Sequence, residues 1–513
     1  MQSRLTRILM LLALYLFTIN LSTSAQVTLG TTEKPVEGAL LQLKNLPQTK
    51  ENGLTNATKG LMMPRVLLSK KHDLKPMFSN NVEDYNRNKT YIDREHTGLL
   101  VYNTQANTAE LICKGMNVWN GTEWQCLSRP KYTIDCSSIK VRGVGKKDQP
   151  LDPEKHYIEL DIDIDDSSIG LPYVINTNTV DGISFSDRGV LDVVGKKSIK
   201  LRGQGTPTTF DYKYFTISTN STSSNATCDA EFFMVLPMKG IFSFGYYQNS
   251  AGYLGQTGSD LRIMMDAPQN FGEQDNSKVK LERHSSTQTF YPFNIISGSD
   301  AYDPNKIKQI LDTKPDIVFT GFDLIPSTTD RSTFVNLLID YIKAGGVLIF
   351  ICERETTSQA FFKALYPNNT INYHWTTTNT LSFYNTDNSF LNGPFGDIRN
   401  KLWGNDTAGA TAISGIPAED IEVLSTNLNG VPLIFKHKKY NLIYIGEGGF
   451  NAMASTAPAN TVSYPFAIDG QGTPVTRTGF HNGSTVENSR FMANVLAWAV
   501  YQAQFHGINT PKE

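Results

Sequence analysis

Cys352 directly follows a continuous apolar segment, residues 347–351, and its position suits covalent chemistry better than that of any other side chain. A Gly-Gly pair precedes the segment, and a helix-like stretch lies on each side of it. Continuous apolar strands are typical of parallel sheets that are covered on both faces. In open parallel sheets, ligands and catalytic groups lie at the carboxyl ends of the strands. Cys352 therefore stands where a nucleophile would stand.

Acidic residues near the same predicted edge argue against thiol chemistry and offer an alternative. Glu353 follows Cys352 directly, and a neighbouring carboxylate raises the pKa of a thiol, which disfavours the reactive thiolate. A second glutamate, Glu447, follows another apolar segment. The alternative function is a hydrolase or carbohydrate-active enzyme in which Cys352 or Glu353 acts together with Glu447. It requires that these groups converge on one open cleft.

No metal or cofactor signature stands out in the sequence, and we predict no cofactor. The histidines that could serve as ligands or bases are scattered, without the short spacing of zinc ligands: His284, His374, His437 and His481. The sequence has no P-loop and no dinucleotide-binding glycine pattern. Asp406-Thr407-Ala408 matches a short pattern seen at bacterial O-glycosylation sites. Some aromatic residues could line a sugar site, although such residues more often pack in a core: Tyr246, Tyr247, Tyr253, Trp375 and Trp403.

The composition is that of an ordinary folded protein. A chain of 513 residues is long enough for about three domains. Hydrophobic residues make up 40% and charged residues 19%, which argues against a disordered chain. The formal net charge is −2, without a long run of one sign. This balance argues against a nucleic-acid groove and against a polybasic membrane patch.

The first 25 residues are predicted to be a cleavable secretion signal. Arg4 and Arg7 supply the positive region, and residues 8–19 supply an apolar core that is too short to be a good membrane span. Residues 21–25 supply a small-residue cleavage site. We expect the mature chain to begin at Gln26 and to contain no integral membrane span. The expected location is secreted or at the cell surface, with the periplasm as an alternative.

Five cysteines in an exported chain suggest disulfides. Cys113 and Cys126 flank a segment with an Asn-Gly turn, so a hairpin would bring them together. Cys136 and Cys228 bracket the next module and could join its first strand to its last. Cys352 is then left as a thiol. The alternative is five reduced, buried cysteines, which an oxidising compartment disfavours.

Three domains are predicted after the signal, at residues 26–130, 131–237 and 238–513. The first is a small β-rich module, in which residues 80–90 look like a polar, mobile loop. In the second, residues 157–165 alternate apolar and acidic side chains, which predicts an antiparallel β-sandwich with Ile158, Leu160, Ile162 and Ile164 in its core. Its acidic stripe, from Asp161 to Asp166, suits a solvated face better than a calcium site, because alternate carboxylates on one strand lie too far apart.

The third region alternates strand-like and helix-like segments, which predicts an α/β doubly wound fold. The expected strands include residues 240–245, 316–321, 346–352, 432–436 and 440–446. The expected helices are 302–312, 334–344, 357–365 and 488–504.

Ordered motifs in each region resemble known families. Residues 30–32, 59–66, 97–104 and 119–124 resemble the N-terminal module of exported surface proteins of Gram-negative anaerobes. The strand series of the second region resembles immunoglobulin-like repeats of bacterial adhesins. Residues 345–350, 391–397 and 442–450 resemble the class I glutamine amidotransferase-like superfamily, particularly its ThuA-like and non-catalytic branches.

The third region departs from the catalytic members of that superfamily. In those members the cysteine is followed by small residues, and a histidine on a late strand acts as its base. Here Glu353, Arg354 and Glu355 follow the cysteine, and the late strand ends at residues 446–449 without a histidine. The resemblance therefore implies a non-catalytic scaffold, with no catalytic residue assigned. We expect a secreted or surface-associated, adhesin-like binding protein whose ligand is a glycan or a protein.

Overall fold

The chain is a β-rich protein of more than one domain. The computed structural model describes residues 26–47, 49, 55–223, 227–245, 252–322, 330–406, 409–453 and 462–510, so the predicted secretion signal lies outside it. Contacts divide the chain into two compact units. The first comprises Met1–Tyr132, Ile164–Pro172 and Val190–Gly195, and the second comprises Thr133–Asp163, Tyr173–Gly189 and Lys196–Glu513. Within the described ranges, no helix is both long enough and apolar enough to cross a membrane.

Two small sheets form in the first unit. β1 (Val27–Leu29) and β2 (Leu41–Leu43) pair in parallel. Four strands form the second sheet, in the order β3 (Arg65–Val66), β4 (Leu100–Asn103), β5 (Gly115–Trp119) and β6 (Trp124–Cys126). β5 and β6 are the hairpin expected from the Asn-Gly turn, and a disulfide joins Cys113 to Cys126, as the sequence suggested.

A helix, α2 (Val82–Glu95), occupies the segment where we expected a mobile loop at residues 80–90, so that expectation was wrong. The hydroxyl of Tyr85, which is buried, donates to Asp93 Oδ1 at 2.9 Å. The indole N–H of Trp119 donates to the backbone oxygen of Asp93 at 2.7 Å. The first bond lies within α2, whereas the second joins the helix to β5, and the amide of Leu74 also donates to the Tyr85 hydroxyl at 3.0 Å. The polar sequence of the helix gave little sign of this buried face. A short 3-10 helix, η1 (Lys75–Phe78), precedes it.

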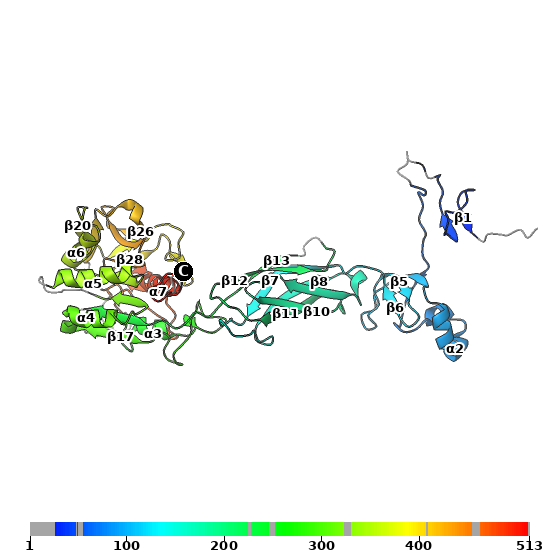
Figure 1. The fold of residues 1–513 in the computed structure, drawn as a ribbon, viewed down its shortest axis with the longest axis horizontal. Coiled ribbons are helices and arrows are strands. Elements are labelled where there is room, and N and C mark those ends of the chain that lie inside the picture. Colours follow the sequence, from blue (N-terminus) through cyan, green and yellow to red (C-terminus); the bar gives the residue numbers. More distant parts are fainter. Residues whose placement is uncertain are drawn as a thin grey trace, which may run out of the picture. The chain divides into compact units, whose positions relative to one another are not determined.

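A seven-stranded sheet occupies most of residues 132–232 (Figure 1). Its order is β13 (Cys228–Phe232), β12 (Lys213–Thr219), β9 (Pro172–Thr177), β10 (Ile183–Val190), β11 (Gly195–Gly205), β8 (Tyr157–Ile164) and β7 (Tyr132–Arg142). The four residues predicted to face the core, Ile158, Leu160, Ile162 and Ile164, are buried, which confirms the alternation. A disulfide joins Cys136 to Cys228, with 5.5 Å between their Cα atoms. These cysteines lie on the first and last strands of the order, so the sheet curls until its edges meet.

A second seven-stranded sheet carries the candidate site. Its order is β17 (Phe293–Ser297), β14 (Ile241–Gly245), β18 (Ile317–Thr320), β19 (Val347–Ile351), β28 (Leu442–Ile445), β27 (Pro432–His437) and β26 (Ile421–Thr426). The first five strands run parallel, and the last two pair antiparallel. Five predicted strands, at 240–245, 316–321, 346–352, 432–436 and 440–446, coincide with β14, β18, β19, β27 and β28 within two residues.

Helices cover both faces of this sheet. α4 (Pro304–Leu311), α5 (Arg331–Lys343) and α6 (Glu355–Leu365) contribute to one apolar core, and α3 (Asp260–Asp266) and α7 (Asn488–Phe505) contribute to the other. α4 to α7 lie where the four helices were predicted, within three residues. Alternate residues along β19 and the residue after it enter opposite cores: Ile349 and Ile351 face one, whereas Phe350 and Cys352 face the other.

Short strand pairs complete this region. They are β15 (Phe271–Gly272) with β16 (Val279–Lys280), β20 (Asn372–Thr376) with β25 (Ala410–Ser414), β21 (Thr380–Ser382) with β24 (Leu402–Gly404), β22 (Asn392–Gly393) with β23 (Gly396–Asp397), and β29 (Arg477–Phe480) with β30 (Ser484–Val486).

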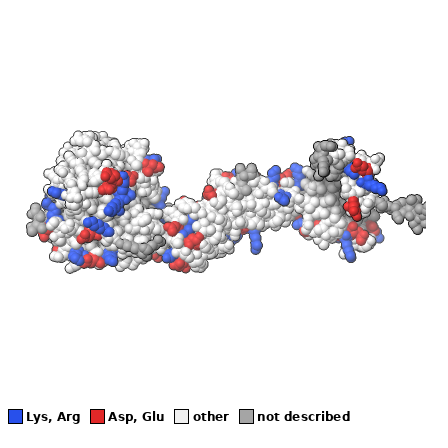
Figure 2. All heavy atoms as spheres, turned by 45° about the horizontal axis from the view of Figure 1, so that its top comes forward, with Lys and Arg blue, Asp and Glu red and all other residues white. Residues whose placement is uncertain are grey.

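Acidic and basic side chains are interspersed on the face drawn in Figure 2, as the small net charge leads one to expect.

Candidate functional site

Three carboxyl groups meet beyond the carboxyl ends of two parallel strands. Glu353 follows β19, Glu447 follows β28, and Asp406 lies between β24 and β25. One carboxylate oxygen from each residue lies within 4.8 Å of the others. β19 and β28 are hydrogen-bonded neighbours, with Ile351 opposite Ile445, so the residues just beyond them emerge at the same edge. The sequence thus named two members of the cluster and missed Asp406.

Glycines allow the backbone to pass close to these carboxylates. A Cβ atom on Gly449 would lie 1.9 Å from Asp406 Oδ2, and one on Gly448 would lie 2.9 Å from Glu353 Oε2. A Cβ on Gly446 would lie 2.0 Å from the backbone oxygen of Thr411. The glycine-rich segment after β28 therefore passes close to Asp406, to Glu353 and to the backbone of Thr411.

Burial determines the electrostatics of the cluster. Glu447 is fully buried, Asp406 is almost so, and Glu353 is half-buried. Burial raises the pKa of Glu447 well above its usual value, and the neighbouring Asp406 and Glu353 raise it further. One oxygen of Glu447 accepts a hydrogen bond from the Gly449 amide at 2.8 Å, whereas Oε2 accepts none from the described residues.

A tyrosine completes the wall of the cluster. The hydroxyl of Tyr253 lies 3.1 Å from Asp406 Oδ2 and donates to it. Burial, and next the charge of Asp406, raise the pKa of Tyr253, so the phenol keeps its proton. Like charges this close in a buried site cannot all remain ionised unless a cation compensates them. The three carboxyls can therefore either retain a proton, as a general acid would, or hold a cation that prefers oxygen ligands.

Cys352 does not face this cluster. Its side chain is fully buried within the core formed by α4, α5 and α6, and its sulfur lies 3.7 Å from the backbone oxygen of Arg354. The next residue, Glu353, points to the cluster instead. The structure thus separates the side chain of Cys352 from the two glutamates with which it was grouped, and its sulfur is buried.

The two histidines nearest in sequence to the late strand, His437 and His481, are not members of the carboxylate cluster. Burial lowers the pKa of His437 to about 4. Its Nδ1 accepts hydrogen bonds from the amides of Lys439 and Tyr440, at 3.0 and 3.1 Å. The neutral ring therefore carries its proton on Nε2, which lies 2.7 Å from the Tyr366 hydroxyl. His481 lies in the turn between β29 and β30.

The aromatic residues considered for a sugar site are dispersed. Tyr253 belongs to the carboxylate cluster, and Trp403 is buried with its indole N–H donating to Ser425 Oγ at 2.8 Å. Trp375 is exposed on β20. Tyr246, Tyr247 and the Thr407-Ala408 pair of the glycosylation pattern lie outside the described residues, and Asp406 of that pattern is buried.

Comparison with protein families gives one match, confined to the N-terminal part. Residues 28–140 match a family described as a phage tail like trimerisation region. Comparison with curated protein sequences gives no match.

The solved structures that match the chain share little sequence with it. A protein from Thermoplasma acidophilum described as a putative GMP synthase subunit is 10% identical and has a TM-score of 0.28; the match covers 52% of this chain and 96% of that one. A putative ThuA-like protein from Bacteroides uniformis is 11% identical, also with a TM-score of 0.28, over 53% and 94% of the two chains. The CARDB domain of a Pyrococcus furiosus protein, in complex with di-metal ions, is 12% identical with a TM-score of 0.15, over 22% and 98%.

Proposed function

We propose that this protein is an exported, trimeric binding protein of the cell surface. In this proposal the N-terminal module assembles three copies, and an immunoglobulin-like sandwich follows it. A doubly wound, amidotransferase-like domain without a working nucleophile then binds a glycan or protein ligand. The observation that carries the proposal is an apolar surface, left exposed among the described residues, in the region that matches the trimerisation family.

That surface lies on the sheet of β1 and β2. Val27 pairs with Leu41 and Leu29 pairs with Leu43, so all four side chains share one face. All four are exposed. A two-stranded sheet is not stable alone in water, and an exposed apolar face makes isolation still less favourable. Copies of the same face on other chains would cover it.

More apolar side chains follow in the same region. Leu40 is 74% exposed, Leu61 is 64% exposed and Met62 is 83% exposed. These residues lie within the 28–140 segment that matches the trimerisation family. Single exposed apolar residues are ordinary, but three more within the matched segment add apolar area that association of copies would cover.

The non-catalytic assignment of the C-terminal domain rests on Cys352. A catalytic cysteine must present its thiolate to a substrate. The side chain of Cys352 is instead buried among the apolar residues that pack beneath α4, α5 and α6. A domain with this arrangement keeps the fold as a scaffold for recognition.

Analytical ultracentrifugation of the mature chain, residues 26–513, tests the assembly. We expect a trimer in the wild type and a shift toward monomer when Leu29→Asp and Leu41→Asp are combined, because two charges would then oppose association. Leu428→Asp is the matched control, since Leu428 is 78% exposed and lies outside the matched region. A monomeric wild type, or a double variant that stays trimeric, would overturn the proposal.

The carboxylate cluster supports a second candidate, a hydrolase or carbohydrate-active enzyme. Glu447, kept protonated by burial, would donate a proton, and the half-buried Glu353 would act as the base or nucleophile. Turnover of a panel of glycosides and esters tests this idea. Activity that is lost in Glu353→Gln but kept in Cys352→Ala would establish it, and absence of turnover across the panel would dismiss it.

A further inference from the structure

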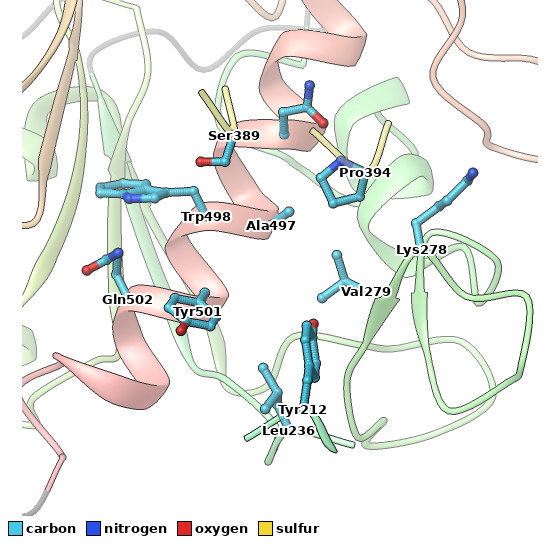
Figure 3. Close-up of a pocket in the computed structure, with 11 residues that line it drawn as sticks. Tyr212, Leu236, Lys278, Val279, Ser389, Pro394, Ala497, Trp498, Tyr501 and Gln502 are labelled. Carbon is cyan, nitrogen blue, oxygen red and sulfur yellow. The ribbon is translucent and has the colours of Figure 1, made fainter. Parts of the chain in front are cut away.

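A cavity of about 340 Å³ lies beside α7, and nothing described so far assigns it a role (Figure 3). Trp498, Tyr501 and Gln502 of α7 line it, together with Tyr212, Leu236 and Lys278. This volume is near the lower end of the roughly 300–1,000 Å³ of small-molecule pockets. It has room for one or two sugar rings.

Aromatic rings form much of the wall. Trp498 and Tyr501 are three positions apart on α7 and therefore lie on the same side of that helix. Trp498 packs against Phe390 at a centroid distance of 5.2 Å, which fixes one side of the cavity. Tyr212 is held by Phe233 in an edge-to-face contact at 5.0 Å. Figure 3 shows the three rings around the same space, with Leu236 at its lower side.

Polar groups around the cavity are not used by the protein itself. The side chains of Gln502, Ser389, Tyr501 and Lys278 make no hydrogen bond or ion pair with any residue in the described ranges. Asn494, which also lines the cavity, differs because its amide binds Phe390, Phe395 and Gly396. The lining therefore combines apolar ring faces with available donors and acceptors, and Lys278 is the one charged residue among the described residues that form it.

We infer that this cavity binds a saccharide of one or two rings. The C–H face of a pyranose packs on aromatic rings, and its hydroxyls need several donors and acceptors at once. A purely apolar ligand would leave the amide, the hydroxyls and the ammonium group without partners. A highly charged ligand would need more than one cation. Lys278 adds a preference for a sugar that carries one carboxylate.

This inference rests on the proposed binding function and names the ligand class. Saturation-transfer NMR of the mature chain with glucose, galactose, N-acetylglucosamine and glucuronate provides the first test. Titration of each binder then gives an affinity. We expect at least one saccharide to bind, and glucuronate to bind more tightly than the neutral sugars. In Lys278→Ala, the affinity for glucuronate should fall to that for the neutral sugars.

Two substitutions in the cavity and one control locate the site. Tyr501→Ala and Gln502→Ala should each weaken binding by about tenfold, the effect of removing an aromatic or hydrogen-bonding contact in a small site. Tyr501 is 45% exposed, so its loss should leave the fold intact. Tyr373→Ala is the matched control, because Tyr373 is 43% exposed and does not line the cavity. It should leave affinity unchanged.

Several results would overturn the inference. Absence of binding by all four sugars would do so, as would binding that both cavity variants leave unaltered. If members of a peptide library bound and the sugars did not, the saccharide inference would be overturned, whereas the proposed binding function would stand. The oligomeric state is read independently by ultracentrifugation, so failure of the trimer and failure of the cavity are distinguishable.

Discussion

Replacing Glu447 by glutamine should make stability less sensitive to rising pH. Glu447 is fully buried beside Asp406 and Glu353, and its pKa is raised above 4.5 in the folded state by burial and by those neighbours. Between pH 4.5 and the folded pKa, the unfolded chain has released this proton whereas the folded chain retains it. The unfolding free energy of the wild type therefore falls as pH rises through that window.

The slope sets the magnitude. One retained proton lowers the unfolding free energy by about 1.4 kcal/mol for each pH unit. The glutamine side chain of Glu447→Gln does not titrate, and its amide oxygen can still accept a hydrogen bond from the Gly449 N–H. The variant should therefore match the wild type near pH 4.5 and exceed it at pH 8.

Urea unfolding at pH 4.5, 6 and 8 with EDTA measures this difference. Tryptophan fluorescence suits it because Trp403 of β24 packs against Phe450, with 5.8 Å between ring centroids, and Phe450 lies three residues after Glu447. Glu355→Gln is a control, because that residue lies outside the cluster. Repeating the series with calcium tests whether a cation offsets the repulsion, which would raise wild-type stability at pH 8 more than that of the variant. Equal destabilisation of Glu447→Gln at every pH would refute the reasoning.

Three further predictions concern packing and the cysteines. Gly449→Ala should lower the unfolding free energy by about 1–3 kcal/mol, because its Cβ would collide with Asp406, whereas Gly470→Ala, with no atom within 4 Å, should not; denaturant midpoints measure both. Reduction of the Cys136–Cys228 disulfide, which joins residues 92 positions apart, should lower the unfolding free energy by about 4.6 kcal/mol in the chain-entropy model. If Cys136→Ser and Cys228→Ser each left the denaturant midpoint unchanged, that expectation would be contradicted. Cys352 should resist alkylation in the native protein and react fully in guanidinium, as mass spectrometry can show; rapid native labelling would mean that its sulfur is accessible.

Where the apolar pattern was continuous, the sequence was enough to place an element. β19 and β28 are each short runs of aliphatic and aromatic residues, and burial on both faces leaves little other use for such runs. Their adjacency, which brings Glu353 to Glu447, depends on strand order, and strand order is not written in either segment. From the sequence, convergence of the two glutamates could therefore only be stated as a requirement of the hydrolase alternative, and it was the structure that showed it.

Other features depend on contacts between distant segments. α2 is polar along most of its length, and it is held in place by bonds from Leu74 to Tyr85 and from Trp119 to Asp93, contacts that no local pattern encodes. Asp406 lies between two short strands, in a segment without periodicity, and reaches the cluster only because Gly449 lets the chains approach. A glycine-rich end to an apolar strand was the one available signal, because such a segment often lets a backbone approach another group closely.

The predicted boundary at residues 237 and 238 shows how local and long-range information differ. Pro237 ends a strand-like segment, which favours a boundary there on local grounds. Across that point, however, the amide of Leu236 donates to the backbone oxygen of Lys280 at 2.9 Å, and its side chain joins the core that contains α7. Lys146 also pairs with Glu273 at 2.7 Å.

The boundary remains a prediction, but a fragment that begins at Met238 would expose the apolar surface that Leu236 covers. The cavity beside α7, which Leu236 and Tyr212 help to line, would lose part of its wall in the same fragment. Ligand binding by the cavity therefore requires the preceding strands as well as the α/β domain, and a shared requirement of this kind favours a single cooperative unit over two independent ones.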